Sequence, residues 1–162
     1  MPSFCHVASK SVTRHATVSF YAFDKEDDMK VAVLGSGNGA HAIAYEWSKA
    51  GHDVWMFDFP QFEMIEGIAL KRGIECQGEM QGFADISYAG SDIEAVLDGA
   101  ELIFAVGPAY STQAFAEACK PYAKHGQIYI VCPASFSGAI VFKQGLGIDL
   151  LDERIAVAEI ST

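Results

Sequence analysis

A glycine-rich turn between an apolar run and a helical pattern is the part of this sequence best suited to binding chemistry. The apolar run is 30–34 (KVAVL), and small and apolar side chains recur at helical spacing over 40–50. Such a turn gathers backbone N–H groups at the positive end of a helix dipole, which suits phosphate groups. The turn consists of Gly35, Ser36, Gly37, Asn38, Gly39 and Ala40.

The spacing G-x-G-x-x-A gives the small residues of this turn separate roles. Gly35 permits the tight turn, Gly37 lets the backbone approach a pyrophosphate, and Ala40 lets the helix pack closely on the sheet. We therefore expect the amide groups from Asn38 onward to face the pyrophosphate of a dinucleotide. The alternative is a turn that binds nothing, because the motif alone is a weak signal.

An acidic residue, Asp58, ends the second apolar run, 53–58 (DVWMFD), 18 residues after Ala40. There its carboxylate can accept hydrogen bonds from the adenosine ribose hydroxyls. It would also repel the 2′-phosphate of NADP, because two charges about 4 Å apart interact by roughly 1 to 4 kcal/mol at dielectric constants of about 80 to 20. No arginine follows in 59–61, so we predict NAD(H) over NADP(H). An exposed turn acid is the alternative interpretation of Asp58.

A further turn follows the apolar run 102–106 (LIFAV), and Val106, Gly107 and Pro108 complete the predicted cofactor contacts. If the strand order reverses here, this turn lies at the switch point where ligands bind across strand ends. A simple turn is the alternative. The side chains of 110–112 are expected to cap the following helix rather than to contact a substrate.

The elements that must position these residues alternate between short apolar runs and helical patterns. Strands that alternate with helices pair in parallel through right-handed crossovers. The predicted fold class is therefore α/β, a Rossmann-like doubly wound parallel sheet with flanking helices. The strands are expected at 30–34, 53–58, 102–106, 127–131 and 155–158, with a small strand pair within 73–87.

Helices are expected between these strands. A short helix should begin at an S-x-x-E capping box from Ser91 to Glu94. Pro121 should end another helix, which contains Phe115. Further helices are expected after Pro60 and over 136–146.

The composition narrows the classes of partner. A formal charge of −10 argues against nucleic acid, whose phosphates it would repel. No apolar run approaches the roughly 20 residues that span a bilayer, so no membrane partner is expected. The cysteines lack the paired spacing of a zinc site, which favours reduced thiols in a cytoplasmic protein, with Cys132 buried. They are Cys5, Cys76, Cys119 and Cys132.

The histidines show no metal-ligand spacing on a helix face, so no metal is predicted. His41 lies beside the glycine turn, where a cofactor-facing or packing role is expected. His52 and His125 precede strands and are expected to be surface turn residues. His6 and His15 belong to an irregular amino-terminal segment.

This segment, residues 1–28, differs from the rest of the chain. It has no acidic residue up to Phe23 and then an acidic run over 24–28. It lacks the long apolar stretch of a secretory signal. We expect a poorly ordered extension before a single domain at 29–162, with a weak organelle transit peptide as the alternative.

The glycine turn and four later segments resemble the amino-terminal domain of the octopine/nopaline (opine) dehydrogenase family. Ketopantoate reductases and related dehydrogenases share the opening motif. The sequence departs from the family at 132–134, Cys-Pro-Ala, where a Pro-Gly pair is expected. The resembling segments are 30–44 (KVAVLGSGNGAHAIA), 74–87, 105–111 (AVGPAYS), 126–142 (GQIYIVCPASFSGAIVF) and 158–162.

The resemblance implies a reductive condensation, in which an amino acid and a 2-oxo acid form an imine that NAD(P)H reduces. It also implies that the catalytic histidine and the substrate-binding residues lie in a second, helical domain, expected after Thr162. No catalytic residue is therefore assigned here, and the chain is expected to bind NAD(H) without turnover. A domain that lacks its partner would expose apolar surface, which predicts self-association.

Two alternatives remain open. One is the cofactor domain of a ketopantoate reductase-like or hydroxyacid dehydrogenase, which shares the opening motif. The other is a non-catalytic NAD-sensing module, in which cofactor occupancy changes the affinity for a protein partner.

Overall fold

The computed structural model describes residues 28–78, 80–133 and 137–161. The interpretation of 1–28 as an extension, with His6 and His15, therefore lies almost wholly outside the described residues, as does Ala134 of the departure at 132–134. The elements are β1 (Lys30–Leu34), α1 (Asn38–Lys49), β2 (Asp53–Phe57), α2 (Met64–Lys71), β3 (Gly73–Cys76), β4 (Gly82–Asp85), β5 (Tyr88–Gly90), α3 (Ile93–Leu97), β6 (Leu102–Val106), the 3-10 turn η1 (Ala109–Ser111), α4 (Thr112–Cys119), β7 (Ile128–Cys132), α5 (Gly138–Leu146) and β8 (Ala156–Glu159).

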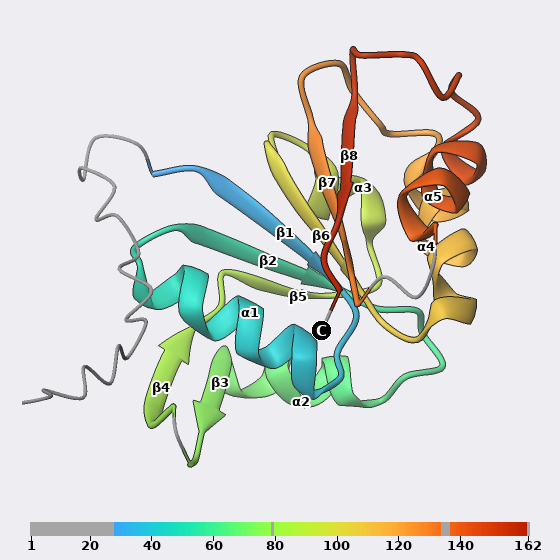
Figure 1. The fold of residues 1–162 in the computed structure, drawn as a ribbon. Helices are drawn as coiled ribbons and strands as arrows, with labels where there is room; N and C mark the ends of the chain where they lie inside the picture. The colour runs from blue at the N-terminus through green and yellow to red at the C-terminus, as the bar shows by residue number, and fades with distance from the viewer. Residues whose placement is uncertain (1–27, 79, 134–136, 162) are drawn as a thin grey trace, which may run out of the picture.

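Six strands form one sheet in the order β5-β2-β1-β6-β7-β8, and every neighbouring pair is parallel (Figure 1). The chain extends the sheet from β1 toward β5 and then crosses back to place β6 on the other side of β1. This reversal between β1 and β6 confirms the doubly wound α/β fold. The predicted strand pair within 73–87 is also confirmed, because β3 and β4 form a separate antiparallel ribbon.

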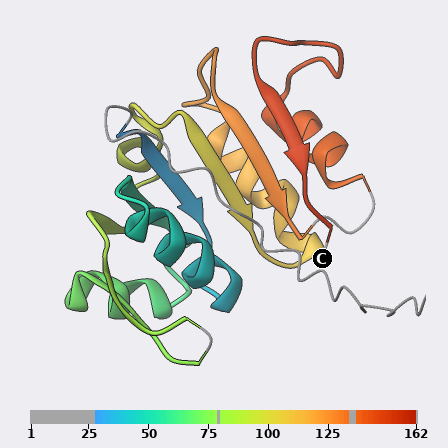
Figure 2. The same ribbon diagram turned by 60° about the vertical axis from the view of Figure 1, so that its left-hand side comes forward.

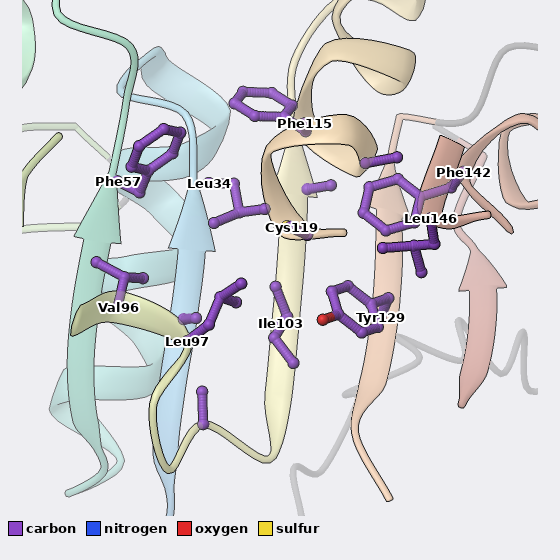
Figure 3. Packing of buried hydrophobic residues seen from close by; sticks show 14 of the residues in the cluster. Leu34, Phe57, Val96, Leu97, Ile103, Phe115, Cys119, Tyr129, Phe142 and Leu146 are labelled. Atoms are coloured by element: carbon purple, nitrogen blue, oxygen red, sulfur yellow. The ribbon is translucent and has the colours of Figure 1, made fainter. Parts of the chain in front are cut away.

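Helices cover the sheet on both faces, as Figure 2 shows for α1 in front of β1 and α4 behind β7. On one face, side chains of α3, α4 and α5 pack on β1, β6 and β7 (Figure 3). On the other, α1 and α2 pack on β1, β2 and β6. Burial on both faces explains the continuous apolar runs of the strands.

The core face shown in Figure 3 joins elements that are far apart along the chain. The ring of Tyr129 on β7 lies 5.3 Å from the ring of Phe142 on α5, and both residues are 0% exposed. Each fully buried large apolar side chain contributes about 1.5 to 3 kcal/mol relative to exposure. This packing fixes α5 on the face of β7.

The edge strand β5 was not predicted from the sequence. Its three residues, Tyr88–Gly90, pair with β2 at Trp55, Met56 and Phe57. The rings of Tyr88 and Trp55 stack at 5.1 Å. A three-residue strand without an apolar run has no periodic signal, so only pairing with β2 defines it.

Two local expectations were wrong. The cap of α3 is Asp92 rather than Ser91, because the Asp92 carboxylate accepts from the N–H of Ala95 at 3.1 Å. His52 is buried rather than exposed, since its ring packs 4.9 Å from that of Trp47 at the end of α1. His125 is exposed and Cys132 is buried, as predicted.

Within the described ranges, no helix is long and apolar enough to cross a bilayer. The same residues contain no group of three or more His, Cys, Asp or Glu side chains that could hold a metal ion.

Candidate functional site

A cleft of about 660 Å³ opens at the carboxyl ends of β1, β2 and β6, where the strand order reverses. Open parallel sheets bind ligands at such a switch point. Three loops that are distant in sequence form its walls. The predicted residues among its lining are Gly35, Ser36, Gly37, Asp58, Val106, Gly107 and Pro108.

The other three predicted residues begin α1 and do not line the cleft. Asn38 and Gly39 are exposed, whereas Ala40 is fully buried against the sheet, as its packing role requires. The N–H of His41 donates to the carbonyl of Gly37 at 3.0 Å. The preceding amides, from Asn38 to Ala40, therefore lie before the first intrahelical bond and have no partner within the helix.

Gly35 is required by the protein itself. Its φ of 114° lies in a region that L side chains rarely adopt. A Cβ at this position would also collide with the carbonyl oxygen of Val106. Its N–H donates to the carbonyl of Phe57 at 2.7 Å, so the turn is tied to β2 as well as to β6.

Gly37 is not required by the protein. Its φ is −77°, and a Cβ built there would meet no heavy atom within 4 Å. Gly37 is exposed and lines the cleft beside the first turn of α1. The absence of a side chain therefore leaves open space at the helix N-terminus, which suits close approach of a ligand backbone.

The loop after β6 is shaped by Gly107 and Ser111. A Cβ at Gly107 would collide with the Ser111 hydroxyl and lie 3.2 Å from the Phe115 ring. Ser111 precedes α4 at its N-cap position, but its side chain makes no cap bond. Its hydroxyl instead donates to the carbonyl of Pro108 at 2.7 Å. The helix-capping role predicted within 110–112 is therefore wrong for this side chain, which braces the loop.

Asp58 is held by two hydrogen bonds at the end of β2. The hydroxyl of Ser36 donates to Oδ2 at 2.6 Å, and the N–H of Phe59 donates to Oδ1 at 2.9 Å. Asp58 is only 5% exposed, so the alternative of an exposed turn acid does not describe it. A carboxylate accepts about four hydrogen bonds, so it retains acceptor sites toward the cleft.

The cleft has acidic and apolar walls. Asp58 and Glu63 line it, and none of its lining residues is Lys, Arg or His. The ring of Phe59 stacks on that of Phe115 at 5.4 Å and 17°. Tyr110 stands at the rim, 85% exposed. A phosphate in this cleft would therefore be held by neutral hydrogen-bond donors, among them the backbone amides at the start of α1.

Sequence reasoning missed the residues that continue the wall after Asp58. Their position directly after a predicted site residue was the available signal, but their inward orientation depends on how the 59–64 segment folds. The added lining residues are Phe59, Gln61, Phe62, Glu63, Met64, Tyr110, Ser111, Ala114 and Phe115.

The residues present fit a dinucleotide. The open space beside Gly37 and the free amides of α1 suit a pyrophosphate, and the Asp58 carboxylate faces the same cleft. A family model described as NADP oxidoreductase coenzyme F420-dependent matches residues 30–135, which include all of these groups. The chain belongs to this family. The oxidoreductase domain thus carries its glycine turn and Asp58 within the matched part.

Comparison with individual proteins agrees with this assignment. The oxidoreductase domain is 32% identical over 114 residues to opine dehydrogenase of Arthrobacter sp. (strain 1C), a match that covers 70% of the chain and 32% of the relative. The chain therefore spans about a third of the length of that curated relative. The resemblance to the opine dehydrogenase NAD-binding domain is confirmed.

Solved structures show the same fold. Octopine dehydrogenase with NADH and L-arginine has a TM-score of 0.65 at 22% identity, covering 82% of this chain and 34% of that one. Ketopantoate reductase from Ralstonia eutropha has a TM-score of 0.63 at 22% identity, covering 80% and 40%. The chain is an NAD(P)-binding oxidoreductase domain related to opine dehydrogenase, and it shares its fold with octopine dehydrogenase and ketopantoate reductase.

Proposed function

We propose that this chain is the NAD(H)-binding part of an opine-type dehydrogenase. The observation that carries the proposal is the open space beside Gly37, between the free amides of α1 and the Asp58 carboxylate. The amides of Asn38 to Ala40 would hold the pyrophosphate, with the helix dipole contributing about half a positive charge. Asp58 would accept hydrogen bonds from the ribose hydroxyls.

The charges of the cleft favour NAD(H) over NADP(H), although the family description names NADP. A 2′-phosphate near Asp58 would lie beside a buried carboxylate, with Glu63 on the same wall. Among the residues that the structure describes, no cationic side chain lines the cleft to offset this repulsion. Repulsion of roughly 1 to 4 kcal/mol corresponds to about a fivefold to several-hundredfold difference in affinity.

The proposed reaction is reduction of an imine formed from an amino acid and a 2-oxo acid. NADH, when bound, would supply the hydride. In this proposal the residues of the chain bind and orient the dinucleotide, and none is assigned a proton transfer. Turnover would then need residues from the part of the relatives that this chain does not span.

A second candidate substrate class comes from the comparisons. The ketopantoate reductase structure matches almost as well as octopine dehydrogenase, with TM-scores of 0.63 and 0.65. The cofactor site would be the same in either case. The classes differ in whether an imine or a 2-oxo acid carbonyl receives the hydride.

Calorimetric titration of the purified chain with NADH and NADPH tests the cofactor proposal. We expect saturable NADH binding, about tenfold or more weaker NADPH binding, and loss of NADH binding in Gly37→Val. Gly67→Val is the matched control, because a Cβ at Gly67 also meets no atom within 4 Å but lies outside this cleft. Equal NADH affinity in Gly37→Val and the wild type would reject the site.

A further inference from the structure

We infer that Ser36 is a positioning residue for cofactor specificity, which acts by orienting the Asp58 carboxylate toward the ribose. The inference rests on the proposed NAD(H) site and assigns its preference for an unphosphorylated ribose to a pair of residues rather than to Asp58 alone. Ser36 occupies the first variable position of the G-x-G-x-x-A turn. The roles described for Gly35, Gly37 and Ala40 give no function to the side chain at this position.

The two side chains form a buried bond between separate loops. Ser36 Oγ lies 2.6 Å from Asp58 Oδ2, across 22 residues of sequence. Ser36 is 3% exposed and Asp58 is 5% exposed. A distance of this size is typical of a hydroxyl that donates to a charged carboxylate, and such bonds are stronger than neutral ones.

The Ser36 hydroxyl restricts the rotation of the carboxylate. The terminal torsion of an Asp side chain is broad and roughly two-fold, so one anchor leaves the plane of the group loosely defined. The other anchor is the N–H of Phe59, which reaches only Oδ1. With both bonds in place, each carboxylate oxygen has one donor and the plane of the group is set.

The direction of this bond also determines what the pair can recognise. Because the Ser36 proton points to Asp58, Ser36 offers no side-chain donor to a phosphate. The Asp58 carboxylate that it orients acts toward the cleft as an acceptor. A ribose diol brings two hydroxyl donors, whereas a phosphate dianion brings none. The hydrogen-bond donors of the ribose therefore favour NADH, in addition to the charge repulsion that disfavours NADPH.

A double-mutant cycle tests this role. Dissociation constants for NADH and NADPH are measured by calorimetry on the wild type, Ser36→Ala, Asp58→Ala and the double variant. We expect Ser36→Ala to reduce the NADH preference by about tenfold when Asp58 is present, as for loss of one hydrogen bond to a charged group. In the Asp58→Ala background, which leaves the Ser36 hydroxyl without a carboxylate, Ser36→Ala should leave the NADH-to-NADPH ratio unchanged.

Ser48→Ala is the matched control, because it removes a 2.7 Å hydroxyl bond, to the carbonyl of Asp85, outside the cleft. It should leave the ratio unchanged. If Ser36→Ala weakens both dinucleotides equally in both backgrounds, Ser36 contacts the cofactor directly and the positioning role is wrong. An unchanged ratio in the Asp58 background overturns it as well.

Urea unfolding of the same four proteins without cofactor separates this inference from the proposed function. The bond predicts that the effects of Ser36→Ala and Asp58→Ala on the free energy of unfolding are non-additive. Additive effects would show that the two side chains are not bonded, and the inference would then fail. If the two substitutions have non-additive effects on unfolding but the wild type binds no NADH, the proposed function is rejected. The bond then has only a structural role.

Discussion

Gly35 and Gly37 lie two residues apart in one turn, yet the reasons for a glycine differ between the two positions. At Gly35 the exclusion comes from the protein, through a φ of 114° and the carbonyl of Val106. At Gly37 the protein leaves room, and in our proposal the bound dinucleotide would require the glycine. The sequence motif does not distinguish the two positions. The structure shows that the fold requires Gly35 but does not require Gly37.

The same substitution at these two positions should therefore have effects of different size on stability. Gly35→Ala should lower the free energy of unfolding by about 2 kcal/mol or more, through strain and the collision with Val106. Gly37→Ala should change it by less than about 1 kcal/mol, because alanine restricts the unfolded chain but is a poorer N-cap of α1 than glycine. Urea unfolding followed by far-ultraviolet circular dichroism measures both, and equal losses would contradict the distinction.

At the scale of elements, most of the fold was predictable because its strands are buried on both faces. The runs at β1, β2, β6 and β7 are continuous apolar segments that periodicity can detect. The failures lie where local signals compete. Ser91 and Asp92 are both good caps, and the sequence pattern favoured the one that completes an S-x-x-E box.

The cap of α3 gives a direct test at this scale. Asp92→Ala should lower the free energy of unfolding by about 1 kcal/mol, because the Ala95 N–H loses its acceptor at the start of α3. This helix buries Val96 and Leu97 in the core, so the loss should appear in global unfolding. Ser91→Ala is the matched control and should have little effect. A larger loss of stability in Ser91→Ala than in Asp92→Ala would show that Ser91 caps the helix, as the capping-box pattern predicted.

For the whole molecule, burial raises the pKa of thiol and phenol groups that pack between the sheet and its helices. Burial raises the pKa of Cys119 from 9.0 to about 12, and it also raises the pKa of Cys132 and of Tyr129. Such groups stay protonated in the folded chain while they ionise in the unfolded chain. Their contribution to stability is therefore complete below pH 9 and is lost as the pH rises from 9 toward 12.

Stability should accordingly fall on the alkaline side. Cys119 alone should lower the free energy of unfolding by up to about 1.4 kcal/mol per pH unit above pH 9. Cys119→Ala should make the slope between pH 9 and pH 10.5 shallower by that amount, beyond any constant loss from packing. Val131→Ala is the control, because it removes buried packing on β7 without a titratable group, and it should leave the slope as in the wild type. An identical slope in Cys119→Ala would show that this thiol is accessible to solvent.

The sequence by itself determined the features that depend on local backbone chemistry. Alternation of strands and helices predicted the doubly wound sheet, and the glycine spacing with Asp58 predicted the residues around one cleft. These signals are local because chain turns, helix starts and buried strands each need particular residue types at short spacing.

Only the tertiary structure decided what depends on contacts between distant segments. The Ser36–Asp58 bond, the burial of His52 and the pairing of β5 with β2 each join residues from different elements. No pattern along the chain encodes the direction of a hydroxyl proton or the ring that covers a histidine. Their physical origin is packing, which brings groups separated in sequence into contact and removes them from water.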